Sequence, residues 1–308
     1  MATLLIEDPI FRQHRVPPGH PERPERLSAV GAALAEPAFA GLIRREAPRA
    51  DLDRILLAHA PSYVDELRAS APTEGVAQIE ADSYLCPESF SVALHAAGAA
   101  CFAVDTVMSG AAANAFVALR PPGHHAEVDR PMGFCLFNNA AIAARHAQQK
   151  HGASRIAIVD WDVHHGNGTQ AIFWSDPSVL YASTHQMPLY PGTGAISETG
   201  VGNIVNAPLS AGDEGAEFVE AMGERILPAI EAFAPDLIII SAGFDAHWRD
   251  PLAAINLTEK DFAWATEAVM DIAGRLSGGR IVSLLEGGYD LIGLADSAAA
   301  HVAALMQA

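Results

Sequence analysis

The sequence has few cysteines and few basic residues, and each shortage argues against a class of protein. Its 308 residues include three cysteines, at positions 86, 101 and 135, an odd number without CxxC spacing. We therefore expect no disulfide framework and a reducing compartment, by default the cytoplasm. Lysine and arginine number 19 against 37 acids, a formal net charge of −18. Because nucleic-acid binding needs clustered cations, we expect no direct contact with DNA or RNA, whereas cationic substrates would be attracted.

Long apolar runs, internal repeats and low-complexity tracts are also missing. Half of the residues are hydrophobic, enough for a large core, yet no run of about 20 apolar residues suggests a membrane span. The short apolar run at the start meets two acids and does not resemble a signal peptide. The proline-dense stretch 16–26 predicts an irregular loop. Because nothing resembles a linker, we expect a single domain over residues 1–308.

Short apolar runs alternate with segments of helical length. The runs typical of strands buried on both faces of a parallel sheet are 115–119, 156–159, 179–182, 237–240 and 281–285. Ala-rich segments such as 140–149 and 214–233 have the length and composition of helices. This alternation predicts an α/β fold, a three-layer α/β/α sandwich around a mainly parallel sheet.

Polar clusters follow four of the predicted strands. RPPGHHAE comes after residue 119, DWDVHHGNG after 159, SAGFDAH after 240 and EGGYD after 285. Parallel sheets bind ligands beyond the carboxyl ends of their strands. The sequence therefore predicts that histidine, aspartate and tyrosine side chains from four segments meet at one edge of the sheet.

A metal site is the first candidate at this edge. Asp162 and His164 are two residues apart, so in an extended segment they face the same side, as does Asp160. A catalytic zinc takes three protein ligands and keeps an open position, and Asp245 is the candidate third ligand. An Asp-x-His pair alone is more typical of a strand closing into a turn, but together with Asp245 it indicates zinc.

The adjacent His124 and His125 suggest a proton-handling pair, because imidazole titrates near neutral pH. Asp160 and Asn167 are available to orient them. Tyr289 follows two glycines, which permit close backbone approach and could direct its phenol at a developing oxyanion. Taken singly, a structural histidine pair and a core tyrosine remain open alternatives.

Six motifs together resemble the histone deacetylase family. They span nearly the whole chain: HPERPERL (20–27), RPPGHHAE (120–127), GFCLFNN (133–139), VDWDVHHGNGTQ (159–170), SAGFDAHWRDPL (241–252) and LEGGYD (285–290). They are more similar to the class II and bacterial acetylpolyamine-amidohydrolase branch than to class I, since Asn167 stands where class I members carry Asp. The resemblance implies an arginase/deacetylase-like fold and hydrolysis of an acylated amine to a carboxylate, typically acetate, and a free amine.

The resemblance also implies a role for individual residues. Zinc would be held by Asp162, His164 and Asp245. His125 would act as general base and then as the acid that protonates the leaving amine. His124, supported by Asp160, would be its electrostatic partner, and Tyr289 would be the oxyanion donor. Iron or cobalt could serve in place of zinc.

A substrate channel and two structural cation sites follow from the same resemblance. Gly133 and Phe134 would line an acyl-lysine channel, and Tyr190 in LYPGTG stands where the facing wall is usually Phe. One structural K⁺ or Na⁺ would use Asp160, Asp162, His164, Ser183 and Thr184. The other would be bound, largely through backbone carbonyls, by Phe173, Asp176, Val179 and Asn203.

Two rival functions are disfavoured. A two-metal hydrolase of the arginase type would need acids at positions 166 and 243, and both are glycine. A non-catalytic acyl-lysine-binding module should have lost a proton-handling group, and here every candidate group is present.

The substrate class depends on the rim of the channel. In the polyamine-selective eukaryotic branch an acid follows the Asp-Pro after the third zinc ligand, and here this place is Leu252. An uncharged rim favours acyl-lysine in a peptide or protein, because a distant ammonium would find no partner there. An acetylpolyamine or another small amide remains the alternative, because Glu80 or Asp82 could supply a carboxylate.

Overall fold

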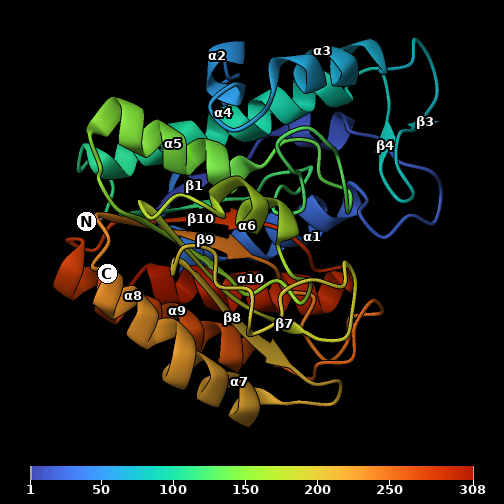
Figure 1. The fold of residues 1–308 in the computed structure, drawn as a ribbon. Coiled ribbons are helices and arrows are strands. Elements are labelled where there is room, and N and C mark those ends of the chain that lie inside the picture. Colours follow the sequence, from blue (N-terminus) through green and yellow to red (C-terminus); the bar gives the residue numbers. More distant parts are fainter. Residues whose placement is uncertain (1, 308) are drawn as a thin grey trace.

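The computed structural model describes residues 2–307, and its centre is a parallel sheet of eight strands (Figure 1). Their order across the sheet is β2-β1-β5-β10-β9-β6-β7-β8. The strands are β1 (Leu4–Ile6), β2 (Ile43–Arg45), β5 (Asn114–Val117), β6 (Ile156–Asp160), β7 (Val179–Gln186), β8 (Ile204–Leu209), β9 (Leu237–Ala242) and β10 (Ile281–Leu285). A small antiparallel hairpin, β3 (Ala77–Gln78) with β4 (Tyr84–Leu85), lies apart from this sheet.

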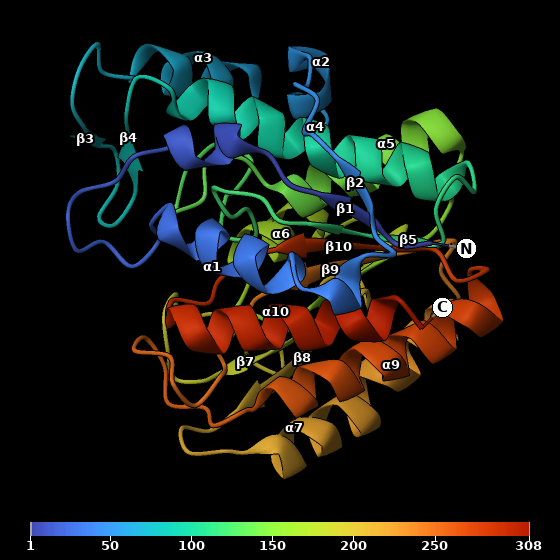
Figure 2. The same ribbon diagram turned by 180° about the vertical axis from the view of Figure 1, so that it is seen from behind.

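Helices cover both faces of the sheet (Figures 1 and 2). One layer contains α2 (Leu52–Ile55), α3 (Pro61–Ala69), α4 (Ser89–Met108), α5 (Asn139–His151) and α6 (Asn167–Phe173). The other contains α1 (Glu25–Leu34), α7 (Gly215–Ala221), α8 (Leu227–Phe233), α9 (Glu259–Leu276) and α10 (Leu291–Leu305). Short 3₁₀ turns occupy Pro9–Gln13 and Pro37–Phe39. The predicted three-layer sandwich is confirmed.

The five predicted strands are all present, with small changes at their ends. β7 runs four residues beyond the predicted 179–182 because its polar residues through Gln186 are also buried and paired with β8. The prediction missed β1 and β2, which have three residues each, and β8, which contains a proline.

The predicted helices are also present. The segment 140–149 is α5. The segment 214–233 is not one regular helix, because a π-helical turn, Met222–Ile226, separates α7 from α8. The proline-rich stretch 16–26 is irregular up to Pro24, and α1 begins at Glu25, because proline is compatible with the first turn of a helix but not its interior.

α4 is long and apolar enough to cross a membrane by length and composition, which the search for apolar runs in the sequence did not indicate. Within the protein, 72% of its apolar window is buried, against α5 and the sheet. Packing on the sheet accounts for its apolar character. Cys86, Cys101 and Cys135 are buried free thiols, as expected.

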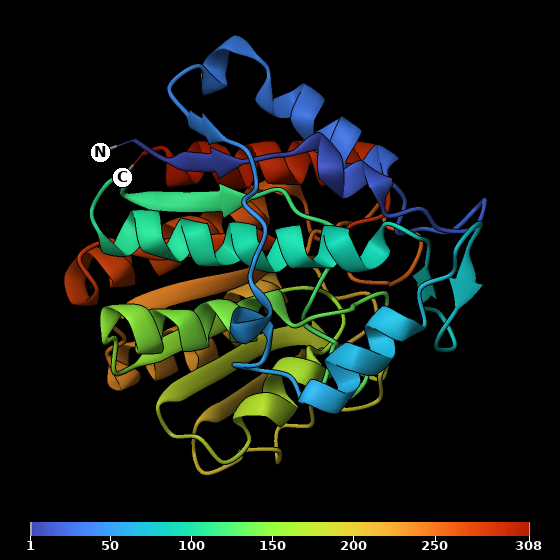
Figure 3. The ribbon, with the colours of Figure 1, turned by 90° about the horizontal axis from the view of Figure 1, so that it is seen from above.

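The sheet order brings the four polar segments together. β5, β10, β9 and β6 are consecutive neighbours, and all run parallel. Seen from above, the chain ends lie at the opposite edge of the sheet from these segments (Figure 3). The residues that follow the four strands therefore share one edge.

Candidate functional site

Three side chains from two loops form a buried cluster of possible metal ligands at this edge. His164 Nδ1 lies 3.1 Å from Asp162 Oδ1 and 3.1 Å from Asp245 Oδ2. The second oxygen of each carboxylate accepts a backbone N–H, from Gly287 to Asp162 (2.7 Å) and from Val163 to Asp245 (2.8 Å). These backbone bonds fix both carboxylates with the remaining oxygens directed at the imidazole. Two carboxylates and one imidazole match the donor set of a catalytic zinc.

The electrostatics of this cluster favour a cation. Burial and the charge of Asp162 raise the pKa of Asp245 to about 6. Burial by itself lowers the pKa of His164, but the hydrogen bonds with Asp162 and Asp245 outweigh it and raise this pKa to about 10. Two buried carboxylates so close together need a positive charge between them. The residues present therefore fit a divalent metal.

The two adjacent histidines have opposite environments. His124 Nδ1 lies 3.0 Å from Asp160 Oδ2, and His125 Nδ1 lies 2.8 Å from Asn167 Oδ1. Burial by itself lowers the pKa of His124, but the charges of Asp162 and Asp160 raise it well above its usual range. Burial and the positive charges of its neighbours lower the pKa of His125 well below its usual range. These opposite shifts favour a charged His124 beside a neutral His125, with ring centroids 4.0 Å apart.

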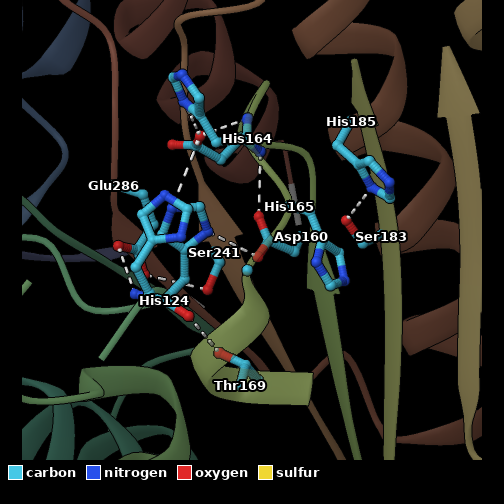
Figure 4. A network of polar contacts seen from close by, with 12 residues as sticks. His124, Asp160, His164, His165, Thr169, Ser183, His185, Ser241 and Glu286 are labelled. Atoms are coloured by element: carbon cyan, nitrogen blue, oxygen red, sulfur yellow. Dashed lines mark hydrogen bonds and ion pairs between the residues drawn. The ribbon is translucent and has the colours of Figure 1, made fainter. Parts of the chain in front are cut away.

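Glu286 and Tyr181 support this pair, and sequence reasoning missed both. Figure 4 shows His124 between Asp160 and Glu286. Glu286 Oε2 accepts the backbone N–H groups of Gly123 (2.6 Å) and His124 (3.2 Å), which holds the histidine loop. The Tyr181 hydroxyl donates to Asp160 Oδ2 at 3.0 Å. Position inside the EGGYD motif was a signal for Glu286, whereas Tyr181 looks like an ordinary strand residue.

Arg26 is a third residue that the sequence did not single out. Its guanidinium donates to the carbonyls of Gly288 and Glu286, both at 2.6 Å, and lies 5.0 Å from the centroid of the Tyr289 ring. Buried Glu22 pairs with it at 3.0 Å. The HPERPERL segment therefore holds the loop that carries Tyr289.

A narrow cavity of about 200 Å³ opens onto the cluster. It is lined by His125, Gly133, Phe134, His164, Leu189, Tyr190, Leu252 and Tyr289. Phe134 has a left-handed backbone (φ 68°), which is costly for a non-glycine residue, and its N–H donates to Ser83 Oγ at 3.0 Å. Ser83 thus helps to hold Phe134 as one wall of the cavity. All four predicted channel residues line it.

Two acids lie near the mouth of this cavity. Glu80 and Asp82 are in the turn between β3 and β4. Burial, together with the charges of Asp82 and Glu80, raises the pKa of Tyr190 above its ordinary value. Carboxylates therefore act on Tyr190 of the cavity lining, opposed by the positive charge of Arg130, although Leu252 itself is uncharged.

The residues expected to bind monovalent cations lie in two places. Asp160 on β6 pairs with Ser183 on β7. The first set therefore lies where these two strands meet the loop that carries Asp162 and His164. In the second set, the Asn203 side-chain nitrogen lies 2.8–2.9 Å from three backbone carbonyls, those of Phe173, Asp176 and Val179.

Two glycine positions leave no room for the acidic side chains that a second metal would need. A Cβ added at Gly166 would collide with the Asp160 carboxylate, and one added at Gly243 would collide with Asp162. The acids that a two-metal hydrolase needs at these positions could not be placed without moving Asp160 and Asp162.

A second cluster of possible ligands lies on α4 and α5. Asp105 Oδ1 is 2.7 Å from His146 Nε2 and 2.7 Å from His151 Nε2. The other oxygen of Asp105 binds Lys150 Nζ at 2.7 Å, and Arg54 contacts His146 Nδ1. A donor at Nδ1 leaves the proton of His146 on Nε2, directed at Asp105. The partners of this cluster are therefore other protein groups, with Lys150 and Arg54 supplying the positive charge beside Asp105.

The chain is similar to known proteins over nearly its full length. The histone deacetylase domain family matches residues 20–305. A histone deacetylase-like amidohydrolase from Pseudomonas aeruginosa is 40% identical, covering 88% of this chain and 73% of the relative. A probable deacetylase from Methanothermobacter thermautotrophicus is 41% identical, covering 93% and 86%. The crystal structure of the HDA15 HD domain superposes with a TM-score of 0.94 at 38% identity, covering 99% of this chain and 88% of that one. This protein belongs to the histone deacetylase family.

Proposed function

We propose that this protein is a zinc-dependent amidohydrolase that removes an acyl group from an acylated amine, most readily the side chain of an acylated lysine in a peptide or protein. One observation carries the proposal: His164 of a buried Asp-His-Asp donor set lines one narrow cavity together with His125 and Tyr289. The family relationship supports the same chemistry, since the Pseudomonas relative is named an amidohydrolase.

Asp162, His164 and Asp245 would hold the zinc, which when bound polarises the amide carbonyl and lowers the pKa of water. His125 accepts the proton of the attacking water. Its Nδ1–H donates to Asn167 Oδ1, so Nε2 is the basic nitrogen, and its lowered pKa keeps it neutral. His125 then gives this proton to the amine nitrogen as the C–N bond breaks, because an amine leaves only when protonated.

His124 and Tyr289 would stabilise charge. His124, held between Asp160 and Glu286, stays protonated and places a positive charge beside the reacting atoms. Burial and the charges of Asp245 and Asp162 raise the pKa of Tyr289 well above its usual range, so its phenol remains a hydrogen-bond donor for the oxyanion.

Turnover and metal content of a single variant test this assignment. His125→Ala should abolish hydrolysis of a fluorogenic acetyl-lysine peptide while the purified protein keeps one zinc, because His125 handles protons and is not a ligand. Loss of zinc in this variant would mean that His125 binds the metal. Absence of turnover in the zinc-loaded wild type would instead favour a non-catalytic binding module.

Acetylpolyamines are the second candidate substrates, and the acids at the cavity mouth favour them. Leu252 offers no charge to a distant ammonium, but Glu80 and Asp82 do. Side-by-side kcat/KM values on acetyl-lysine peptides, acetylputrescine and acetylspermidine separate the two classes. A tenfold or larger preference for an acetylpolyamine that disappears in Glu80→Gln/Asp82→Asn would replace acyl-lysine as the proposed substrate.

A further inference from the structure

We propose that the side-chain amide of Asn203 replaces one structural monovalent cation of the family. The carbonyls of Phe173, Asp176 and Val179 come from the end of α6, the following turn and the start of β7. All three converge on Asn203 Nδ2, at 2.8, 2.9 and 2.8 Å. We call these three carbonyls the carbonyl cradle. The amide nitrogen occupies the point at which a cation would be coordinated.

The geometry of the cradle is that of an ion site. Proteins bind dehydrated monovalent cations with backbone carbonyls that replace the hydration shell. An amide nitrogen has two hydrogens, yet three carbonyls lie at nearly equal distance from this one. The cradle therefore holds one more acceptor than the amide has hydrogens, and backbone carbonyls are the ligands that a dehydrated monovalent cation takes.

Two other polar atoms of Asn203, its backbone carbonyl and its side-chain oxygen, hold it in this position. Its backbone carbonyl accepts the N–H of Tyr181 at 2.9 Å, and its Oδ1 accepts the N–H of Val201 at 3.2 Å. The residue is 4% exposed. A cation could enter only if the amide left, and the buried amide would then lose its partners.

The charges around the cradle already balance one another. The one acid of this turn, Asp176, already binds Ser178 Oγ at 2.6 Å and Arg145 Nη1 at 2.5 Å. The Arg145 guanidinium lies 4.7 Å from the centroid of the Phe173 ring. Arg145 therefore neutralises Asp176, so no unpaired carboxylate of this turn attracts a cation to the cradle, and a neutral amide adds no net charge.

The replacement has a consequence for the candidate site. α6 begins with Asn167, which contacts His125, and ends with Phe173 in the cradle. Asn203 therefore secures the far end of this helix with a covalently attached group. The position of Asn167 should not depend on potassium at the cradle, whatever ion the Asp160 set binds.

Crystals of the wild-type protein grown or soaked in rubidium or thallium chloride test the proposal directly. We expect the Asn203 amide between the three carbonyls and no anomalous density there. Rubidium or thallium at the cradle, with the amide rotated away, would overturn the proposal. An ion beside Asp160 and Ser183 does not bear on it, because that set is separate.

A variant tests the same point in solution. Asn203→Ala removes the amide and leaves the carbonyl cradle open, so replacing choline chloride by potassium chloride at equal ionic strength should raise its thermal midpoint by roughly 2 °C or more beyond the wild-type response. Asn206→Ala is the matched control, because Asn206 is a buried asparagine of β8 that donates to Gln170 at 2.9 Å and not to the cradle.

Equal potassium responses in wild type, Asn203→Ala and Asn206→Ala would show that the three carbonyls do not form a cation site, and the proposal would fail. If Asn203→Ala does not fold, the anomalous density of the wild-type crystals decides the question alone.

Discussion

Replacing Asn167 by aspartate should shift the pH dependence of turnover. Asn167 accepts the Nδ1–H of His125 at 2.8 Å and donates to Glu127 Oε1 at 2.8 Å. Asn167→Asp keeps the shape of the side chain but places a carboxylate against the imidazole. It also turns the hydrogen bond with Glu127 into a pair of like charges.

The size of the shift follows from Coulomb's law. Opposite charges about 4 Å apart at an effective dielectric constant of about 20 attract by about 4 kcal/mol. At 1.36 kcal/mol per unit, this corresponds to a pKa about 3 units higher for His125. Two effects make the expected shift smaller. The wild-type amide already stabilises the charged imidazole through its hydrogen bond. In the variant, repulsion between Glu127 and the new carboxylate favours a proton shared by the two groups, which lowers the negative charge beside His125. We therefore expect a rise of about 1–3 units.

The assay is kcat/KM on an acetyl-lysine peptide between about pH 5 and 9.5. His125 must be neutral to accept a proton, and a raised pKa keeps it charged to higher pH. The acidic limb of the profile should move to higher pH by the same 1–3 units, while activity at alkaline pH changes little. In the double variant Glu127→Gln/Asn167→Asp, the new glutamine can donate a hydrogen bond to the carboxylate introduced at position 167. The acidic limb of its profile should therefore move by at least the same amount. Acidic limbs that stay at the wild-type pH in both variants, with zinc bound, would refute the role of His125 as base.

Three further variants test separate parts of the site and its support. Asp245→Ala should lose both zinc and activity, since two remaining ligands rarely hold a catalytic ion, and metal analysis showing full zinc would contradict this. Tyr289→Phe should lower kcat by about 10²–10³ with little change in substrate binding, and an unchanged kcat would remove Tyr289 from the oxyanion site. Burial raises the pKa of Glu22, but Arg120 and Arg26 outweigh it and lower this pKa from 4.5 to about 2. The charged Glu22 therefore contributes about 3 kcal/mol to the free energy of unfolding, in full above pH 4.5 and less as the pH falls toward 2. In urea titrations at decreasing pH, the difference in unfolding free energy between wild type and Glu22→Gln should narrow. A difference that stays constant would contradict this prediction.

The sequence alone determined five of the eight strands of the sheet and the chemistry at the ends of four of them. Buried parallel strands are continuous apolar runs, so the strands from 156 and 281 could be recognised without knowing their neighbours. Polar residues directly after such runs must lie at the carboxyl edge of the sheet, which placed Asp162, Asp245 and Tyr289 at one edge. These inferences depend on local pattern and strand direction alone.

The tertiary structure decided which strands are neighbours and which distant groups meet. β9 and β10 lie between β5 and β6, because strand pairing depends on contacts between residues far apart in the chain. Arg26 reaches carbonyls some 260 residues away, and no local pattern in HPERPERL specifies that contact. The amide of Asn203 fills the carbonyl cradle because the backbone between the end of α6 and the start of β7 directs three carbonyls at one side chain. The sequence specifies the residue types, whereas the directions of carbonyls and the rotamers of side chains are set by packing in the folded chain.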